Sequence, residues 1–456
     1  MRKVSLLALA VAAAVLITTA VVASASISRA HQGEFVLQQR VIQSLANVNG
    51  PGGGAEAGHQ TRLLGALGLE PINADVWTHG NYAYVGTWSG PCPGVGVKIV
   101  DVTDPANPVQ VATAGGYPHT SAEDMQVIHV STASFTGDLL GIGIQDCDGE
   151  GFGGLDLWDV TDPTAPQHLG FYQNLGVHEL SLTARPDGVF ALLASPFSEP
   201  ITGLFFGFVL GDFQLVDVTD PSSPVLTDDW AAHRDGGFEA GGPFFDPPYD
   251  CPTLCRGGFP AVFAHSTSPS ANGRTAYVAY WDLGAVVLDI SDPANIQYVA
   301  RTLYPLGSEG DTHSAVPNAA GTLLATTDED FSPAETDPKV PGDTWGFARL
   351  WSLPGLTHLS DVTTPHSLTN KTDGFYSAHN PVFKSGKLYV SWYTDGVRIF
   401  DVSSPASPRE VGFYRPPPHR GILARRPIPL VWGVALGGSR IYLSDMFFGL
   451  YVLEER

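Results

Sequence analysis

The chain has 456 residues, of which 51 are Gly and 36 are Pro, while hydrophobic residues make up 43% and aromatic residues 10%. Gly and Pro destabilise helix interiors by roughly 1 and 3 kcal/mol, so this composition excludes a coiled coil or a long helical bundle, and the apolar content excludes a disordered chain. With 24 Lys and Arg against 46 Asp and Glu, the net charge is -22. Such a charge repels phosphate backbones and anionic lipid, so nucleic acid is not expected among the partners.

The N-terminus has the pattern of a secretory signal peptide. Arg2 and Lys3 precede an apolar run over residues 6–22, and small residues follow up to Ala25. A short basic region, an apolar core and a small-residue cleavage site are the parts of such a signal. We therefore expect cleavage after Ala25 and a secreted, extracellular or cell-surface protein. Because the run is slightly long, an uncleaved membrane anchor is the alternative, and no later segment is apolar enough to span a bilayer.

A repeated phrase is the strongest signal in the rest of the chain. In its clearest form it reads Val-Asp-Val-Thr-Asp-Pro. Five clear copies lie at 97–108, 155–166, 213–224, 285–295 and 397–408, and two weaker copies lie at 347–352 and 449–454. Each copy predicts a strand that stops at Asp-Pro, because Pro cannot continue a central ladder. Repeats of this kind dictate the architecture of a chain.

Further strands surround each copy. A strand such as 81–87 or 387–391 precedes the copy, another strand comes before that one, and a fourth follows Asp-Pro. Four antiparallel strands repeated seven times predict an all-β fold, a seven-bladed β-propeller. The last copy ends in its third strand, so its fourth strand must come from elsewhere. Residues 62–67 resemble the fourth strands at 167–172 and 409–414, and we expect this N-terminal strand to close the last blade.

The tandem Val-Asp-Val-Thr-Asp-Pro and Phe-Asp-Val-Ser-Ser-Pro phrases resemble the LVIVD-repeat family of secreted and cell-surface β-propellers, and the resemblance covers nearly all of residues 60–456. It implies the fold and an exported location. It implies no activity, since that family is largely without an assigned biochemical function and its Asp-Pro residues form turns. The copy in blade five has Ser352 in place of Asp. This departure weakens the prediction of the outer strands of that blade and leaves the predicted number of blades unchanged.

These patterns divide the chain into three parts. They are a signal peptide at 1–25, a loosely ordered leader at 26–58 that includes a Gly-rich stretch, and the propeller at 59–456. A ring that closes on itself needs no partner subunit, so a monomer is expected.

The 4 Cys predict two disulfides in an exported protein. Cys92 and Cys147 stand at matching places in two consecutive repeats, and Cys251 and Cys255 lie in one short loop. We therefore pair Cys92 with Cys147 and Cys251 with Cys255. Cysteines so widely spread do not suit a zinc site made of thiolates.

Histidines and acids stand at matching places in several repeats. The starts of four successive innermost strands carry His178, His265, His313 and His379, and the equivalent places in other blades carry Asp75, Asp124 and Trp432. Acids, including Asp328, stand near the ends of second strands. In a propeller blade these two places share a face, so imidazoles and carboxylates are expected at one mouth of the central channel.

Two interpretations of this arrangement remain open. The first is a site for a divalent or transition-metal ion, structural or catalytic, with the candidate ligands His178, His265, His313, His379, Asp124 and Asp328. The second is a hydrogen-bonded scaffold of His and Asp like that of WD-type propellers. The acidic runs at 146–150 and 328–330 could bind calcium or could be solvated loop acids.

Long insertions fall on the same predicted face of the propeller. Long loops on one face of a fold usually mark its functional site. The candidate ligand-binding residues there are the aromatic side chains Trp230, Phe244, Phe245, Tyr249 and Trp432. Such rings could stack on a sugar or a peptide, or could plug the channel.

The sequence has no serine-hydrolase elbow, phosphate loop or zinc-peptidase motif. We therefore expect a secreted propeller that acts as a binding or interaction scaffold for a protein, peptide or carbohydrate. An exported metal-dependent oxidoreductase or hydrolase with the histidine site is the alternative.

Overall fold

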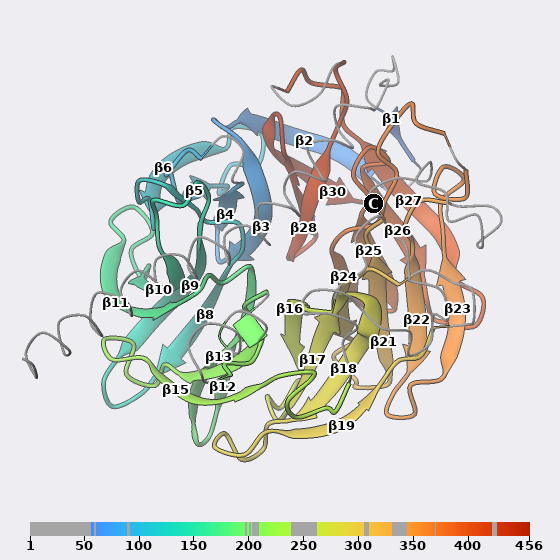
Figure 1. Cartoon of the computed structure of the whole chain (residues 1–456). Helices are drawn as coiled ribbons and strands as arrows, with labels where there is room; N and C mark the ends of the chain where they lie inside the picture. Colours follow the sequence, from blue (N-terminus) through green and yellow to red (C-terminus); the bar gives the residue numbers. More distant parts are fainter. Residues whose placement is uncertain are drawn as a thin grey trace, which may run out of the picture.

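Seven antiparallel sheets stand around one axis as the blades of a β-propeller (Figure 1). The computed structural model describes residues 56–58, 61–88, 92–196, 198–199, 202, 209–238, 262–304, 310–330, 344–369, 371–421 and 426–456. The innermost strands of neighbouring blades contact one another around the axis. The predicted all-β fold and the count of seven blades are therefore confirmed. Within the described residues, no helix combines the length and the apolar character that crossing a membrane requires.

Each blade consists of successive strands from the axis outward. Blade 1 has β3 (Asn73–His79), β4 (Tyr82–Thr87), β5 (Val97–Asp101) and β6 (Val109–Ala114). Blade 2 has β7 (Thr120–Ser121) and β8 (Met125–Ser131) as a divided inner strand, then β9 (Thr136–Asp146), β10 (Gly153–Asp159) and β11 (Gln167–Asn174). Blade 3 has β12 (Glu179–Arg185), β13 (Gly188–Ala194), β14 (Phe213–Asp217) and β15 (Val225–Trp230).

Blade 4 has β16 (Ala264–Pro269), β17 (Thr275–Tyr280), β18 (Gly284–Asp289) and β19 (Gln297–Arg301), with the short helix η1 (Trp281–Leu283) between β17 and β18. Blade 5 has β20 (Thr312–Pro317), β21 (Leu323–Asp328), β22 (Ala348–Ser352) and β23 (His358–Val362), so it is complete despite Ser352. Blade 6 has β24 (Pro381–Lys384), β25 (Lys387–Ser391), β26 (Val397–Asp401) and β27 (Arg409–Arg415). Blade 7 has β28 (Val431–Gly437), β29 (Arg440–Asp445) and β30 (Gly449–Glu455).

The N-terminal segment closes the ring, as the sequence predicts. Strand β2 (Thr61–Gly68) is the outer strand of blade 7, where Thr61 pairs with Glu455. Just before it, β1 (Glu56–Ala57) pairs with β27 and adds a fifth strand to blade 6. The last residues of the expected leader therefore belong to a sheet. The signal peptide and most of the leader lie outside the described residues.

The repeated Asp residues build the turns between the third and fourth strands. The carboxylate of Asp101 accepts the main-chain N–H of Thr103 at 2.8 Å. The Asp residues at 159, 217, 289 and 401 accept the matching N–H at 2.8 to 3.0 Å. Asp104 then accepts the N–H of Ala106 at 3.0 Å. These bonds are Asx turns, so the Asp-Pro phrase is a folding signal.

Each such turn packs on the preceding blade. In all seven blades the register shifts between the third and fourth strands, which bends the outer strand. A Cβ added to Gly65 in β2 would lie 2.3 Å from the carbonyl oxygen of Pro105, and one added to Gly170 in β11 would lie 2.4 Å from that of Pro221. Only glycine permits these backbone approaches.

The hydrophobic core lies between neighbouring blades. One cluster joins Val97 and Ile99 of blade 1 to Leu140 and Ile142 of blade 2, and similar clusters follow around the ring. Third strands such as β5 are therefore buried on both faces. This burial explains their continuous runs of Val, Ile and Leu.

A disulfide joins Cys92, in the connection between β4 and β5, to Cys147 at the end of β9, with their Cα atoms 5.6 Å apart. This predicted pair is confirmed, and it ties blade 1 to blade 2. The other predicted pair, Cys251 and Cys255, lies outside the described residues.

Candidate metal centre at the channel mouth

Innermost strands share an irregularity at their first residues. His265 in β16 and His313 in β20 each lie at a shift in register with the second strand of the blade. Trp432 in β28 and Asp75 in β3 lie at the equivalent shifts. A β-bulge leaves a residue without a ladder partner and re-aims its side chain. The backbone of the repeat therefore sets the positions of these four side chains.

Four imidazoles lie in a row at this end of the propeller. In the order His178, His265, His313 and His379, the centroids of neighbouring rings are 4.3, 4.1 and 3.9 Å apart. All four side chains are buried. The Nε2 atoms of His178 and His265 are 2.9 Å apart. Tertiary structure thus brings together the four histidines that the sequence places at strand starts.

Two glutamates contact the first three imidazoles. Glu123 Oε2 lies 3.4 Å from Nδ1 of His178. Glu179 Oε1 lies 3.8 Å from Nδ1 of His265 and 3.7 Å from Nε2 of His313. In two sets the possible ligand atoms all lie within 4.8 Å of one another, namely His178 with Glu179 and His265, and His265 with His313 and Glu329.

A third glutamate and two aromatic rings continue the row. Glu329 Oε2 lies 3.8 Å from Nε2 of His313, and the hydroxyl of Tyr393 donates to the other oxygen of Glu329. The rings of Tyr393 and Trp432 lie 5.0 and 4.7 Å from that of His379. The site therefore has carboxylates along the imidazoles and an aromatic wall at its His379 end.

Burial lowers the pKa of every imidazole in the row. The pKa falls to about 4 for His178 and to about 3 for His379. For His265 and His313 it falls well below its usual value, first because of burial and further because of the neighbouring imidazoles. At neutral pH the four rings are uncharged, and the neutral imidazole is the form that binds metals.

The carboxyl groups respond in the opposite direction. Burial raises the pKa of Asp124 to about 7 and that of Glu329 to about 8. For Glu179, burial and the nearby acids, first among them Asp124 and Asp75, raise the pKa well above its usual value. A cation would reverse these shifts, because it stabilises the charged carboxylates.

The donor set fits a transition-metal ion. Imidazole nitrogen and carboxylate oxygen are ligands that zinc and iron accept. Among the described residues, the buried Nδ1 atoms of His265 and His379 have no hydrogen-bond partner, although buried polar atoms normally have one. Uncharged imidazoles beside carboxylates therefore meet the chemical requirements of a metal centre.

Asp124, another sequence candidate, supports the site through the main chain. Its carboxylate accepts the N–H of Met125 at 2.8 Å and that of Leu180 at 2.7 Å. It therefore joins the start of the innermost strand of blade 2 to that of blade 3.

Asp328, the remaining acidic candidate, faces away from the imidazoles. It forms an ion pair with Arg349 and accepts a hydrogen bond from the hydroxyl of Tyr304 at 2.9 Å. Its neighbour Glu329 faces His313 instead. Successive side chains at the end of a strand point to opposite sides, so the adjacent carboxylate reaches the histidine row.

The acidic run at 146–150 forms a turn. The carboxylate of Asp146 accepts main-chain N–H groups from Asp148, Gly149 and Gly151 at 3.0, 2.7 and 3.0 Å. These bonds hold the turn, and Asp148 also forms an ion pair with His119 at 2.6 Å.

The described aromatic candidates are buried. Trp230 is 1% exposed and packs on Tyr280 and Tyr298, with ring centroids 5.4 and 6.0 Å away. Trp432 is 3% exposed and lies 5.7 Å from Trp88. The other aromatic candidates, Phe244, Phe245 and Tyr249, lie outside the described residues.

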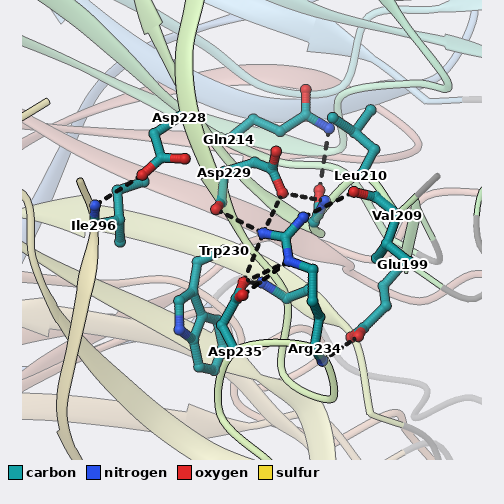
Figure 2. A network of polar contacts seen from close by, with 12 residues as sticks. Glu199, Val209, Leu210, Gln214, Asp228, Asp229, Trp230, Arg234, Asp235 and Ile296 are labelled. Atoms are coloured by element: carbon teal, nitrogen blue, oxygen red, sulfur yellow. Dashed lines mark hydrogen bonds and ion pairs between the residues drawn. The ribbon is translucent and has the colours of Figure 1, made fainter. Parts of the chain in front are cut away.

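A polar network holds the chain on both sides of Trp230 (Figure 2). The guanidinium of Arg234 forms ion pairs with Asp229 at 2.7 Å and Asp235 at 2.6 Å and donates to the carbonyl of Val209 at 2.7 Å. Glu199 accepts the main-chain N–H of Arg234 at 2.7 Å. These contacts join the described segments at 198–199 and 209–210 to residues 229–235.

Sequence reasoning missed Glu179 as a site residue. It directly follows His178 and begins β12, so its position at a strand start was a usable signal. Tyr393 was missed because it lies after a second strand and reaches the site only through Glu329.

Fold and site together define a β-propeller with a buried cluster of histidines and carboxylates at the channel mouth. The LVIVD repeat model matches residues 73–114, 205–230, 268–302 and 385–415. The protein is therefore a β-propeller in which four segments match the LVIVD repeat. No curated protein matches the chain.

Raptor from Chaetomium thermophilum is a similar solved structure, with a TM-score of 0.55 and 11% sequence identity. The match covers 88% of this chain and 30% of that chain, so the protein spans about a third of the length of Raptor. At this identity the likeness shows the fold alone.

Proposed function

We propose that this protein is an exported metal-dependent enzyme, an oxidoreductase or a hydrolase, with the histidine row as its active site. The observation that carries the proposal is that possible ligand atoms gather in two sets, in each of which they all lie within 4.8 Å of one another, namely His178 with Glu179 and His265, and His265 with His313 and Glu329. The signal-peptide pattern of residues 1–25 supports export.

The ligands would be His265 together with either His178 and Glu179 or His313 and Glu329. Imidazole and carboxylate together suit zinc, iron or copper. When bound, such an ion polarises an oxygen atom of a substrate or lowers the pKa of a coordinated water.

The chain's own groups prepare this site. Glu123 and Gln145 face Nδ1 of His178 at 3.4 and 3.1 Å and orient its ring. Glu179 has a side chain that is 12% exposed, more than any imidazole of the row. Burial and the nearby acids raise the pKa of Glu179 well above its usual value, and a bound cation would counter this shift by stabilising the carboxylate.

The test is metal analysis of the mature protein, purified without chelator and measured by plasma mass spectrometry. We expect close to one metal ion per chain in the wild type and less than about a tenth of that in the His265→Ala, His313→Ala double variant. The matched control is His129→Ala, which removes a histidine whose side chain is 63% exposed on β8 and should leave the metal content unchanged. A metal-loaded wild type would then enter a screen for hydrolase and oxidase activity.

Absence of metal from the wild type would overturn the proposal. The histidine row would then be a hydrogen-bonded scaffold, and a propeller that binds a protein, peptide or carbohydrate through its elaborated loops would be the remaining function. Equal loss of metal in His129→Ala would show adventitious binding to surface histidines.

A further inference from the structure

A hydrogen-bonded chain of four side chains leads from His313 in blade 5 to Asp75 in blade 1. Nδ1 of His313 lies 2.8 Å from the hydroxyl oxygen of Ser314, and this hydroxyl donates to Oδ1 of Asn380 at 2.8 Å. The side-chain N–H of Asn380 donates to Oδ2 of Asp75. The chain starts in β20, passes the residue just before β24 of blade 6 and ends in β3, so the packing of the blades assembles it.

The direction of these bonds places the proton on the imidazole of His313. The amide of Asn380 presents its NH₂ group to Asp75 and its oxygen to Ser314. The hydroxyl of Ser314 has a single proton, which it donates to Asn380, so toward His313 its oxygen can only accept. Nδ1 of His313 therefore carries the proton of the neutral ring, and Nε2 keeps its lone pair.

Asp75 is held as the acceptor at the end of the chain. Its Oδ1 accepts the main-chain N–H of Val76 at 3.2 Å, and a Cβ added to Gly433 of blade 7 would lie 2.2 Å from the same oxygen. The side chains of Asp75, Ser314 and His313 are buried, so bulk water does not compete for their hydrogen bonds. Both oxygens of Asp75 accept hydrogen bonds, which fixes the direction of the chain from this end.

The lone pair of His313 is available where a metal would bind. Its Nε2 lies 3.7 Å from Oε1 of Glu179 and 3.8 Å from Oε2 of Glu329, and a neutral imidazole binds a metal through its unprotonated nitrogen. In contrast, the Nε2 atoms of His178 and His265 lie 2.9 Å apart, a hydrogen-bond distance that requires a proton on one of them. A metal bound to both of these atoms would first have to displace that proton.

We propose that the three residues that follow His313 in this chain are positioning residues, which hold its ring in the tautomer whose Nε2 can bind a metal. They are Ser314, Asn380 and Asp75. The metal site is then the second of the two sets, His265 with His313 and Glu329. Partners of this kind fix the tautomer of a ligating imidazole, and their loss typically weakens metal binding about 10–100-fold. The choice of ligand set rests on the proposed function, whereas the tautomer is a property of the metal-free protein.

The first experiment determines the tautomer by ¹⁵N NMR of the full mature chain, labelled at its histidine rings and freed of metal with a chelator. The signals lost in His313→Gln assign the ring, and we expect the wild type to carry the proton on Nδ1. In Asp75→Asn, the amide oxygen can keep the bond to Val76 while the new NH₂ group faces Asn380. The direction of the chain then reverses, and the proton should move to Nε2.

A second variant and a control accompany this measurement. Ser314→Ala removes the hydroxyl next to the ring and should give a mixture of both tautomers, which keeps the test decisive if Asp75→Asn does not fold. The control is Ser181→Ala, which removes a buried hydroxyl that donates to the main-chain carbonyl of Thr267 at 2.6 Å. This variant should keep the wild-type tautomer.

The second experiment measures the affinity of the same proteins for Zn²⁺ in competition with a chromophoric chelator. We expect Asp75→Asn and Ser314→Ala to bind Zn²⁺ at least about 10-fold more weakly than the wild type, and Ser181→Ala to bind it equally well. A proton on Nε2 blocks the ligand atom, whereas a lost hydroxyl elsewhere in the core does not.

The outcomes separate this inference from the proposed function. A wild-type proton on Nε2, or a proton that stays on Nδ1 in folded Asp75→Asn and Ser314→Ala, would overturn the role of the chain. Unchanged Zn²⁺ affinity in variants whose proton has moved would overturn the choice of ligand set and assign the metal to His178, Glu179 and His265. A wild type that carries the proton on Nδ1 and binds no Zn²⁺ would overturn the proposed function, and with it the ligand set, while the chain would still fix the tautomer.

Discussion

Adjacent acids at the end of β21 have different environments. Asp328 is paired with Arg349 inside the blade, whereas Glu329 faces His313. Both side chains are buried, so composition and spacing alone could not separate a structural acid from a candidate ligand.

Substituting Asp328 should therefore change mainly the stability of the protein, and substituting Glu329 should change mainly its metal content. Asp328→Asn removes the nearer of the two carboxylates that face the buried guanidinium of Arg349, the other being that of Asp361 at 3.8 Å, and should lower the free energy of unfolding by about 3–5 kcal/mol, with the metal content unchanged. Glu329→Gln should reduce the metal content with a smaller loss of stability. Urea unfolding and plasma mass spectrometry measure the two effects. Loss of metal in a folded Asp328→Asn would show that Asp328 is a ligand after all.

Lys98 is a second residue whose environment is set by the fold. Its side chain is 0% exposed, and its ammonium donates to Oδ1 of Asn73 at 2.6 Å. Burial lowers its pKa from 10.5 to about 7.

This shift predicts how stability depends on pH. Between about pH 7 and 10 the unfolded chain holds the Lys98 proton and the folded chain releases it. The contribution of Lys98 to stability therefore rises with pH, by at most about 1.4 kcal/mol per pH unit. We expect the free energy of unfolding of Lys98→Met, measured at pH 7.5 and 9.5, to lack this rise relative to the wild type. The exposed Lys371→Met is the control, and equal pH slopes in Lys98→Met and the wild type would contradict the prediction.

Among the elements, the outer strand of each blade does two things. It completes its own sheet, and its bulge receives the Asp-Pro turn of the next blade, as Gly65 of β2 receives the turn at Pro105. The Asp-Pro turn of each repeat therefore packs against the neighbouring blade, which explains why the same residues are repeated around the ring.

Gly65→Ala tests this contact. Its Cβ would lie 2.3 Å from a main-chain oxygen, so we expect a loss of about 1–3 kcal/mol in stability from overpacking. Ala66→Val, at an exposed position in the same strand, is the control and should be close to neutral. Deletion of residues 60–70 should lower the melting temperature far more, because blade 7 then loses its outer strand. An unchanged melting temperature after that deletion would contradict the role of β2 in closing the ring.

At the scale of the whole molecule, blade 1 is held from both sides. Strand β2 links the chain just before blade 1 to blade 7, and the disulfide between Cys92 and Cys147 links blade 1 to blade 2. Strand β2 and the C-terminal strand β30 therefore lie side by side in the ring (Figure 1).

The disulfide should contribute to the stability of the ring. The two cysteines are 55 residues apart, and the chain-entropy model gives about 4 kcal/mol for a loop of that length. We expect the Cys92→Ser, Cys147→Ser variant to lose up to this amount in urea unfolding. The same experiment on the wild type with reductant should give the same value. Stability equal to that of the oxidised wild type would show that the packing between blades 1 and 2 suffices.

The repeat by itself determined the architecture of this protein. Seven copies of one phrase specify seven sheets, and a last copy that ends in its third strand requires the segment at β2 to complete it. Both conclusions follow from local signals, namely strand propensity, Pro positions and the repeat period. The starts of the innermost strands could likewise be located, and with them His178, His265, His313 and His379.

Only the tertiary structure decided which groups these side chains contact. It placed Glu179 and Glu329 against the imidazoles and Asp328 against Arg349, buried Trp230 in the core, and brought Asn380 beside Asp75. A one-residue bulge reverses the direction in which a side chain points, and closure of the ring joins residues that are far apart in the chain. Neither effect leaves a signal in the local pattern of the sequence, so the partners of each side chain follow from the packing of the blades.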